Sequence, residues 1–261
     1  MKLQVLVAAV DQEVNKLAEK MKLESEAIIV NQCGHFDYSE YRHNDKRIRC
    51  FSMAERGVGL SRNTALMRAE GDICLFSDED IVFDPGYEKA VLSEFEKNAD
   101  ADVITFNFRV DAKRATYYNR KPGRIRWYNY GRYPTYAVAA RTEALRRKNI
   151  CFSLLFGGGA RYSNGEDSLF LHDCLKKGLH LYAVTTELGQ EVYRESTWFK
   201  GYNEKFFVDR GVLYHHLYGR LAGLFSLRFL LAHRKEMLKE TGLIEAYRLM
   251  KGGIVEGKSR K

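Results

Sequence analysis

The sequence is poor in several features that would assign it to a common class of protein. Only 3 prolines occur in 261 residues and no stretch is rich in serine and glycine, so we expect no flexible linker. The 5 cysteines are scattered without paired spacing, which disfavours a disulfide framework and a zinc site. No Gly-x-x-x-x-Gly-Lys-Ser/Thr loop is present, which excludes a P-loop nucleoside triphosphatase.

Long apolar runs are also missing. The N-terminal stretch MKLQVLVAAVDQEV has a short apolar run and no small-residue cleavage pattern, so it predicts a first strand at residues 3–10 rather than a signal peptide. No later run reaches the roughly 20 apolar residues of a membrane span. We therefore expect a cytoplasmic protein, with the inner face of the membrane as a further location.

Short apolar runs alternate instead with helix-compatible segments, and 45% of the residues are apolar, enough for a sizeable core. Strands are predicted at 3–10, 27–31, 47–53, 73–76, 103–108 and 179–185, and helices at 12–22, 61–71, 87–98 and 168–177. This order predicts an α/β domain with a mainly parallel sheet flanked by helices. Ligands of such sheets collect at the carboxyl ends of the strands.

The pattern changes after residue 211. Apolar and basic residues recur three or four apart in the segment LYHHLYGRLAGLFSLRFLLAHRK, at Leu217, Leu221, Leu224, Arg228 and Leu231. This spacing predicts a C-terminal amphipathic helical appendage over 212–261. Two interpretations stay open, because such a helix packs on the domain or docks at a membrane interface through its basic flanks.

Positive charge is concentrated in one segment. The net charge is +8, and 12 basic residues lie in the segment 109–148 against the acids Asp111 and Glu143. Such a segment predicts an anionic partner: the phosphates of a nucleotide, a lipid pyrophosphate, a membrane surface or nucleic acid. Tyrosines and Trp127 are interleaved with the arginines, as in single-strand nucleic-acid binding proteins.

Acidic residues gather at two places. In ICLFSDEDIVF an apolar strand runs into Asp78, Glu79 and Asp80. Clustered carboxylates are costly to desolvate, so this strand end predicts either a divalent-cation site or a solvated turn. Farther on, Glu166 and Asp167 follow Gly165 at a predicted helix start, where acids also act as ordinary caps.

Together with Arg56-Gly-Val-Gly-Leu-Ser-Arg62-Asn63, these motifs resemble glycosyltransferase family 2, which has the GT-A fold. The resemblance covers roughly residues 1–210 and rests on GLSRNTALMRAEGDICLFSDEDIVFDPGY and NGEDSLFLHDCLKKG. It implies a Rossmann-like GT-A domain at 1–211, with a nucleotide-sugar-binding half at 1–108 and an acceptor-binding half at 109–211. The implied activity is metal-dependent, inverting transfer from a nucleotide-sugar, a UDP-sugar by preference, to an acceptor hydroxyl in polysaccharide, glycan or glycolipid synthesis.

The same resemblance implies roles for individual residues. Asp167 would be the base that deprotonates the acceptor hydroxyl, with Glu166 contacting the acceptor. Mn²⁺ or Mg²⁺ would be held by Asp80 and Asp78, with His215 or His216 as a distal ligand. Contacts to the nucleotide-sugar would come from Ala8, Ala9, Val10, Asn31, Gln32, Arg56, Arg62, Asn63, Asp78 and Glu79. The acceptor side would include Gly158 and Trp198, a sugar-stacking candidate that also fits a core position.

The sequence departs from the family pattern in one place, where Asp11-Gln12-Glu13 stands instead of the common Pro-x-Tyr-Asn turn. The contacts to the base are therefore open. The expected partners are the donor, a glycan or lipid-linked acceptor and an anionic membrane, without nucleic acid. Two alternative functions remain: a nucleic-acid-binding protein that uses 109–148, and an inactive homologue that only binds a nucleotide-sugar.

Overall fold

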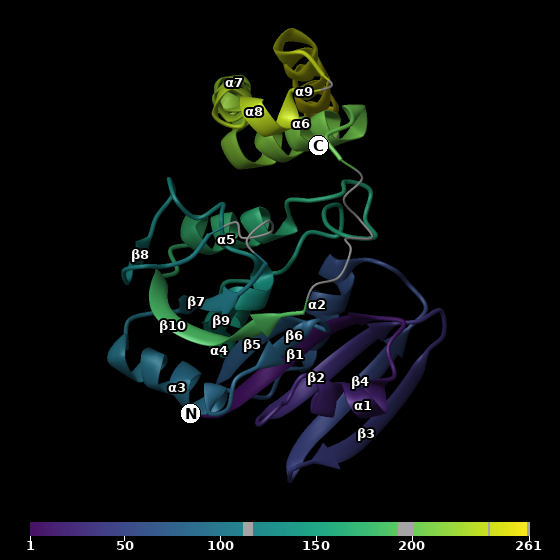
Figure 1. The fold of residues 1–261 in the computed structure, drawn as a ribbon, viewed down its shortest axis with the longest axis vertical. Coiled ribbons are helices and arrows are strands. Elements are labelled where there is room, and N and C mark those ends of the chain that lie inside the picture. The colour runs from purple at the N-terminus through teal and green to yellow at the C-terminus, as the bar shows by residue number, and fades with distance from the viewer. Residues whose placement is uncertain (112–116, 193–200, 240, 260–261) are drawn as a thin grey trace.

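The computed structural model describes residues 1–111, 117–192, 201–239 and 241–259. In these residues a ten-stranded sheet with flanking helices forms the larger part, and the C-terminal helices form a layer of their own beside it (Figure 1). The α/β class and the helical C-terminal segment predicted from the sequence are therefore confirmed.

The first half of the sheet is parallel. Its strands are adjacent in the order β4 (Lys46–Met53), β2 (Glu26–Gln32), β1 (Leu3–Val10) and β5 (Ile73–Asp78). In the register of this half, Val5 of β1 lies opposite Ala27 on one side and Leu75 on the other. The strands β1, β2 and β5 are buried over most of their length, as expected where helices cover both faces of a sheet, and β4 is buried at its centre. Their carboxyl ends meet at one edge of the sheet, called here the carboxyl edge.

Three helices connect these strands and the next ones: α1 (Val14–Lys20), α2 (Val58–Arg68) and α3 (Tyr87–Lys97). The sides of α1 and α3 that carry Leu17, Val91 and Phe95 are buried in the core. Helix α2 begins at Gly57, whose φ of 141° suits glycine. It runs from the carboxyl edge, so its first turns lie beside the ends of β1 and β2.

The second half of the sheet is mixed rather than parallel. Its elements are β6 (Ile81–Phe83), β7 (Val103–Arg109), β8 (Gly123–Ile125), β9 (Val138–Arg141) and β10 (Leu181–Glu191). β9 lies between β5 and β7 and is antiparallel to both, whereas β10 is parallel to β7. An antiparallel strand needs no helical crossover, so the short η1 (Thr135–Ala137) can lead directly into β9. Helices α4 (Thr142–Arg147) and α5 (Glu166–Lys176) complete this half.

Four strands were not predicted from the sequence: β6, β8 and β9, which have three or four residues each, and a longer strand at the edge of the sheet. β3 (Asp37–His43) pairs antiparallel with β4 across a turn at Asn44 and Asp45, whose φ values are 48° and 62°. Two successive residues with positive φ are typical of the tight hairpin turn that asparagine and aspartate tolerate. The strand has no apolar run because it is an exposed edge strand, so hydrophobic periodicity does not reveal it.

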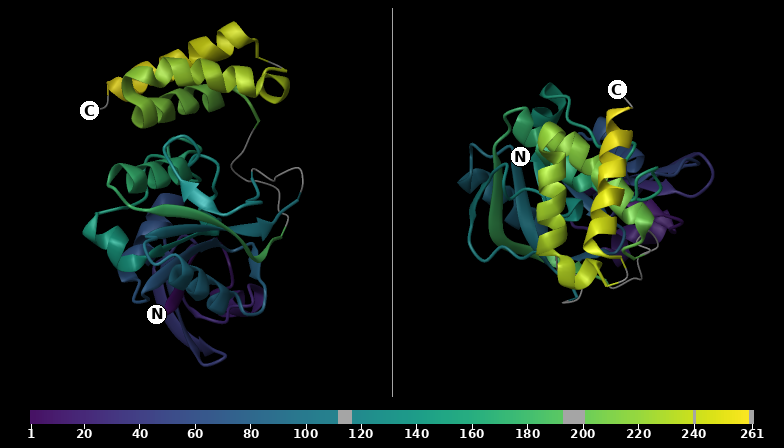
Figure 2. Two further views of the ribbon diagram at one scale, coloured as in Figure 1. Left: turned by 90° about the vertical axis from the view of Figure 1, so that its left-hand side faces the viewer. Right: turned by 90° about the horizontal axis from the view of Figure 1, so that it is seen from above.

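The C-terminal layer consists of α6 (Glu204–Tyr218), η2 (Gly219–Leu221), α7 (Ala222–Ala232), α8 (Arg234–Met237) and α9 (Leu243–Lys258). It begins at Glu204, earlier than the predicted boundary at 212, and the chain breaks at Gly219 instead of continuing as one helix. Glycines let α6 and α9 approach closely, since a Cβ at Gly253 would lie 2.0 Å from the carbonyl oxygen of Val208. Figure 2 shows α7 and α9 over α6, on the side away from the sheet.

Helix α6 packs on the α/β part of the molecule. Its residues Val212, Leu213 and Leu217 belong to the same core as α5 and the loop before it. The Asp209 carboxylate accepts hydrogen bonds from the backbone N and the Oγ of Ser163, both at 2.9 Å. Within the described ranges, no helix is both long enough and apolar enough to span a membrane.

Candidate active site

A buried arginine gathers three carboxylates at the carboxyl edge of the sheet. Arg62, on α2, is only 5% exposed, and its Nη2 lies 3.0 Å from Oδ1 of Asp78 at the end of β5. Its Nη1 lies 3.3 Å from Glu166 Oε1 and 3.3 Å from Asp167 Oδ1, both in the first turn of α5. The two acidic motifs and the arginine motif found in the sequence therefore meet at one guanidinium.

The cluster has more negative than positive charge. Burial by itself would lower the pKa of Arg62, but the charges of Asp78, Asp167 and Glu166 raise it, so the guanidinium stays charged. Burial raises the pKa of Glu166 to about 7, with a further increase from the charge of Asp167, and Arg62 opposes both. Glu166 therefore gains and loses its proton near neutral pH.

The two carboxylate oxygens of Asp167 differ in their surroundings. Its Oδ1 accepts hydrogen bonds from Arg62 and from the hydroxyl of Thr135 in η1. No hydrogen bond from the described residues reaches Oδ2, and the side chain is 33% exposed, against 14% for Glu166. One oxygen is thus fixed by two donors while the other can receive a proton. Nothing in the sequence pattern distinguished Thr135 from the other residues of the basic segment.

Glycines allow the loop before α5 to pack between α5 and α2. A Cβ on Gly157, whose φ is 104°, would lie 2.8 Å from the Glu166 carboxyl carbon. Gly158, predicted on the acceptor side, accepts a hydrogen bond from the backbone N of Val58 at 2.9 Å. The loop therefore forms the wall of the cluster where the first turns of the two helices meet.

Asn63 holds the start of this loop. Its Nδ2 donates to the carbonyl oxygen of Phe152 at 2.9 Å, and its Oδ1 accepts from the Phe152 backbone N at 2.7 Å. Both ends of the amide are thus used by one backbone residue. The predicted contact of Asn63 with a nucleotide stays a prediction.

A second polar group closes the ends of β1 and β2. The Arg56 guanidinium pairs with the carboxylate of Asp11 at 3.0 Å and donates to the carbonyl oxygen of Gln32 at 2.8 Å. The amide of Asn31 bonds the backbone of Gln12 through both its ends, at 3.1 and 2.9 Å. Asp11 lies where this sequence departs from the family pattern. It is the ion-pair partner of Arg56, which was predicted to bind the nucleotide.

The last residues of β1 differ in how far they reach the surface. Ala9 has no exposed surface and Ala8 is 5% exposed, whereas Val10 is half-buried. Ala9 therefore cannot touch a ligand and can only support the residues that do. Val10 and the Arg56–Asp11 pair are the groups that a base at this strand end would meet.

The predicted metal ligands are only partly brought together. Glu79 and Asp80 are half-buried in the turn between β5 and β6, next to Asp78. His215 lies against α9, where a Cβ on Gly257 would lie 3.0 Å from its Cδ2, and its role as a distal ligand stays a prediction. Among the described residues, no group of three or more His, Cys, Asp or Glu side chains is placed to hold a metal ion. Two carboxylates at the end of β5 still suit a cation that shares its other ligands with a diphosphate and water.

The basic segment is less open to nucleic acid than its sequence indicated. Tyr117, Tyr130 and Tyr133 pack in the core, and Tyr118, Trp127 and Tyr128 are its exposed aromatic residues. The side chains of Arg141 and Arg146 donate to backbone carbonyl groups. Trp198, predicted on the acceptor side, lies outside the described residues.

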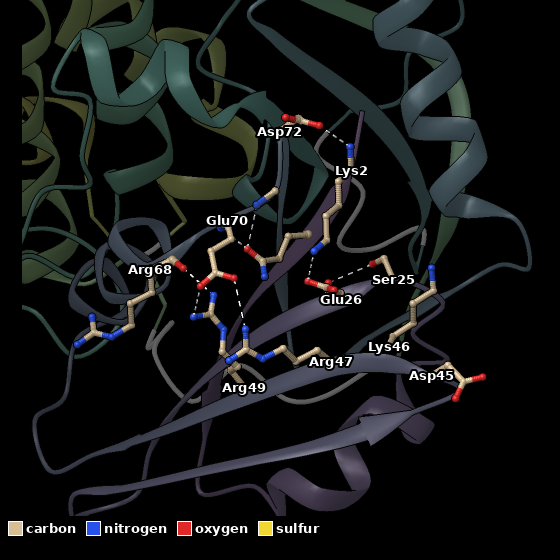
Figure 3. Close-up of polar contacts among 12 residues, drawn as sticks. Lys2, Ser25, Glu26, Asp45, Lys46, Arg47, Arg49, Arg68, Glu70 and Asp72 are labelled. Carbon is tan, nitrogen blue, oxygen red and sulfur yellow. Dashed lines mark hydrogen bonds and ion pairs between the residues drawn. The ribbon is translucent and has the colours of Figure 1, made fainter.

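The opposite edge of the sheet, where the parallel strands begin, carries a different polar network (Figure 3). Lys2 pairs with Glu26 at 2.8 Å, and Arg49 pairs with Glu70 at 2.8 Å. A hollow of about 420 Å³ lies beside this network, lined by Met1, Glu70, Gly71, Asp72, Arg141, Thr142, Glu143 and Arg146. Lys2 and Arg49 each have a carboxylate close by, so no single cation of these pairs faces several acids.

The chain is similar to a known protein family and to several solved structures. A model of the family described as glycosyl transferase family 2 matches residues 9–152. No curated protein matches the sequence. Among solved structures, S. aureus TarS 1–349 in complex with UDP-GlcNAc has a TM-score of 0.67 at 16% identity, over 98% of this chain and 81% of that one.

Two further structures of the same S. aureus protein are similar. The complex of TarS 1–349 with UDP has a TM-score of 0.60 at 16% identity, over 90% of this chain and 72% of that one. A structure of TarS that is not limited to 1–349 has a TM-score of 0.65 at 15% identity, over 98% of this chain and 49% of that one. At these identities the likeness shows a common fold.

Proposed function

Because the chain belongs to glycosyl transferase family 2 and is a glycosyltransferase of the GT-A fold, we propose that it transfers a sugar from a nucleotide-sugar to an acceptor hydroxyl with inversion. The observation that carries this proposal is the carboxylate of Asp167, which is held at Oδ1 by Arg62 and Thr135 and open at Oδ2. A base fixed in this way is what the acceptor hydroxyl needs when it attacks.

In the proposed reaction, Oδ2 of Asp167 takes the proton of the acceptor hydroxyl while the hydroxyl oxygen bonds to the anomeric carbon. The bond from that carbon to the nucleoside diphosphate breaks on the opposite face, so the configuration inverts. Arg62 and Thr135 keep the carboxylate oriented and Arg62 balances part of its charge. Glu166, whose pKa lies near neutral, contacts the acceptor in this proposal.

The donor is proposed to be a UDP-sugar. The titles of the similar TarS structures name UDP-GlcNAc and UDP, which supports a uridine nucleotide for a chain of the same fold. Its base would lie by Val10, Arg56 and Asp11 at the ends of β1 and β2, and its diphosphate by the turn after β5. Asp80, with Asp78, would hold Mn²⁺ or Mg²⁺ there, and such an ion stabilises the charge of a leaving diphosphate.

The acceptor is proposed to be a phosphate-bearing glycan or a lipid-linked glycan. The segment that supplies Thr135 also carries cations that form no ion pair with the described residues: Arg120, Lys121, Arg124, Arg126 and Arg132. Between them, Trp127 and Tyr128 are 70% and 65% exposed and offer faces on which a sugar ring can stack. Synthesis of a polysaccharide, glycan or glycolipid fits such an acceptor.

Ligand-dependent thermal unfolding tests the donor. We expect UDP and UDP-sugars to raise the melting temperature, and to raise it more with Mn²⁺ than without. Asp80→Ala should lose the additional rise in melting temperature that depends on Mn²⁺. The matched control Asp37→Ala, on the exposed strand β3, should keep that rise. If no nucleotide or nucleotide-sugar raises the melting temperature, the donor proposal fails.

The alternatives have distinct outcomes in the same experiments. Salt-sensitive binding of oligonucleotides without any response to nucleotide-sugars would favour a nucleic-acid-binding protein. Donor binding without hydrolysis or transfer of the sugar would favour an inactive homologue.

A further inference from the structure

Helix α7 is apolar on two opposite sides. One side faces the core of the C-terminal layer, where Ala222 and Leu230 are fully buried. The other side carries four leucines that recur three or four residues apart, the first at the end of η2 and the others on α7, with 56%, 65%, 38% and 47% of their surface exposed: Leu221, Leu224, Leu227 and Leu231. We call these four residues the leucine surface. The outer side of a surface helix is normally polar, so this side has the composition of a contact surface.

The α/β part of the molecule does not cover the leucine surface. Helix α6, through Val212 and Leu213, packs on the α/β core, and α7 packs against α6 and α9. Both figures show α7 over α6, away from the sheet (Figures 1 and 2). Because its four leucines are exposed, an external partner can reach the leucine surface.

Cations surround the leucine surface. Exposed basic residues precede it, interrupt it and follow it: Arg220, Arg228, Arg234 and Lys235. None of the four forms an ion pair with a residue in the described part of the chain. Glu236 is the sole acid of the sequence between residues 219 and 239. The surface thus combines exposed leucines with a net positive charge.

We propose that the leucine surface docks α7 in the plane of an anionic membrane. Helices that lie in a membrane interface combine an apolar side with flanking lysine and arginine, which meet acidic headgroups while the apolar side enters the acyl boundary. A second copy of the chain would bring like charges together around the same leucines, which opposes self-association. The proposal does not depend on the reaction, although it would bring the site to a lipid-linked acceptor.

Flotation with lipid vesicles tests the proposal. The full chain should bind vesicles of phosphatidylglycerol and phosphatidylcholine, bind phosphatidylcholine alone more weakly, and be released in part by high salt. Replacing both Leu224 and Leu231 by serine should weaken binding about ten-fold or more, because two large apolar side chains leave the acyl boundary. Arg228→Glu should weaken binding to the anionic vesicles only.

A matched control is Met67→Ser, which changes a side chain 69% exposed on α2 and should leave vesicle binding unchanged. All the changed side chains are exposed, so unaltered circular dichroism spectra and melting temperatures should confirm that the variants fold. Absence of binding to the anionic vesicles at low salt, or equal binding by wild type and the Leu224→Ser, Leu231→Ser variant, would overturn the proposal. So would a dimer in light scattering that this double variant dissociates, because a second copy would then cover the leucines.

Discussion

Both edges of the sheet carry arginines and carboxylates, but the two edges arrange these charges differently. Where the parallel strands begin, Arg49 and Lys2 each have a nearby carboxylate, and the partner Glu70 is half exposed (Figure 3). At the carboxyl edge one buried guanidinium, that of Arg62, faces three carboxylates. Arg49 is buried like Arg62, but its partner is half exposed, so the excess of carboxylates around one cation distinguishes the candidate active site from the network at the opposite edge.

The physical reason is the cost of desolvation. The charges of an exposed ion pair interact almost as favourably with water as with each other, so such a pair contributes little to the free energy of folding. Buried charges lose their hydration, so they persist only where partners compensate for it. An excess of carboxylates around one cation is unfavourable for stability. Burial first, and then the charge of Asp167, raises the pKa of Glu166.

Removing the proposed base should give the largest effect. Asp167→Asn keeps the shape and the acceptor atom for Thr135 but cannot take a proton, so we expect the transfer rate to fall about a thousand-fold or more. Donor-induced stabilisation should be retained. The measurement is product formation together with ligand-dependent melting. The control is Asp173→Asn on the same helix, because the side chain of Asp173 is 46% exposed and should be dispensable. Near-normal transfer by Asp167→Asn would show that Asp167 is not the base.

Removing the cation should destabilise the cluster. Arg62→Met leaves three carboxylates without their shared partner, so we expect the free energy of unfolding in urea to fall by about 3 kcal/mol near pH 7.5. The loss should be smaller at pH 5, where protonation reduces the repulsion. Arg62→Lys, which keeps the charge, should recover part of the stability and shows whether the charge itself matters.

The matched substitution at the opposite edge is Arg47→Met, which removes a cation that pairs with Glu40 at 2.8 Å but is 42% exposed. Its unfolding free energy should equal that of the wild type within error. Equal losses of unfolding free energy in Arg62→Met and Arg47→Met would show that the cluster at the carboxyl edge depends on its cation no more than the opposite edge does.

An effect smaller than that of Arg62→Met is expected from the pH dependence of Glu166. Burial raises its folded pKa to about 7 from an ordinary value of 4.5, so between these pH values the folded state binds more protons than the unfolded state. The free energy of unfolding should therefore fall as pH rises from about 4.5 to about 7 and level off above. Glu166→Gln should remove this slope and gain about 2 kcal/mol relative to wild type at pH 8. Urea unfolding at several pH values measures this slope. Parallel pH profiles of the wild type and Glu166→Gln would contradict the prediction.

The longer buried strands could be predicted from the sequence, whereas the exposed β3 and the short β6, β8 and β9 could not. The predicted first strand, residues 3–10, has the bounds found for β1, because a strand buried on both faces is a continuous apolar run. β3 is polar and exposed, and its only signal was the Asn44-Asp45 turn. The break at Gly219 was missed because the apolar spacing continues across it from Leu217 to Leu231.

Within the site, local motifs identified the acids but not their partners. Asp78, Glu166 and Asp167 stand out in the sequence because polar groups follow a buried strand or open a helix. The hydrogen bond from Thr135 to Asp167 joins residues 32 apart, and Arg56 and Asp11 are 45 apart. Such pairs depend on how the elements pack, and neither periodicity nor a motif encodes them.

The sequence by itself determined the alternation of strands and helices, the family and the acids of the site, because burial patterns and short motifs are local properties of the chain. Only the tertiary structure decided that Arg62 serves the carboxylates, that His215 packs on α9, and that α7 has an exposed leucine side. The reason is that charge balance and burial are properties of the surroundings of a residue. Those surroundings come from segments far apart in the sequence.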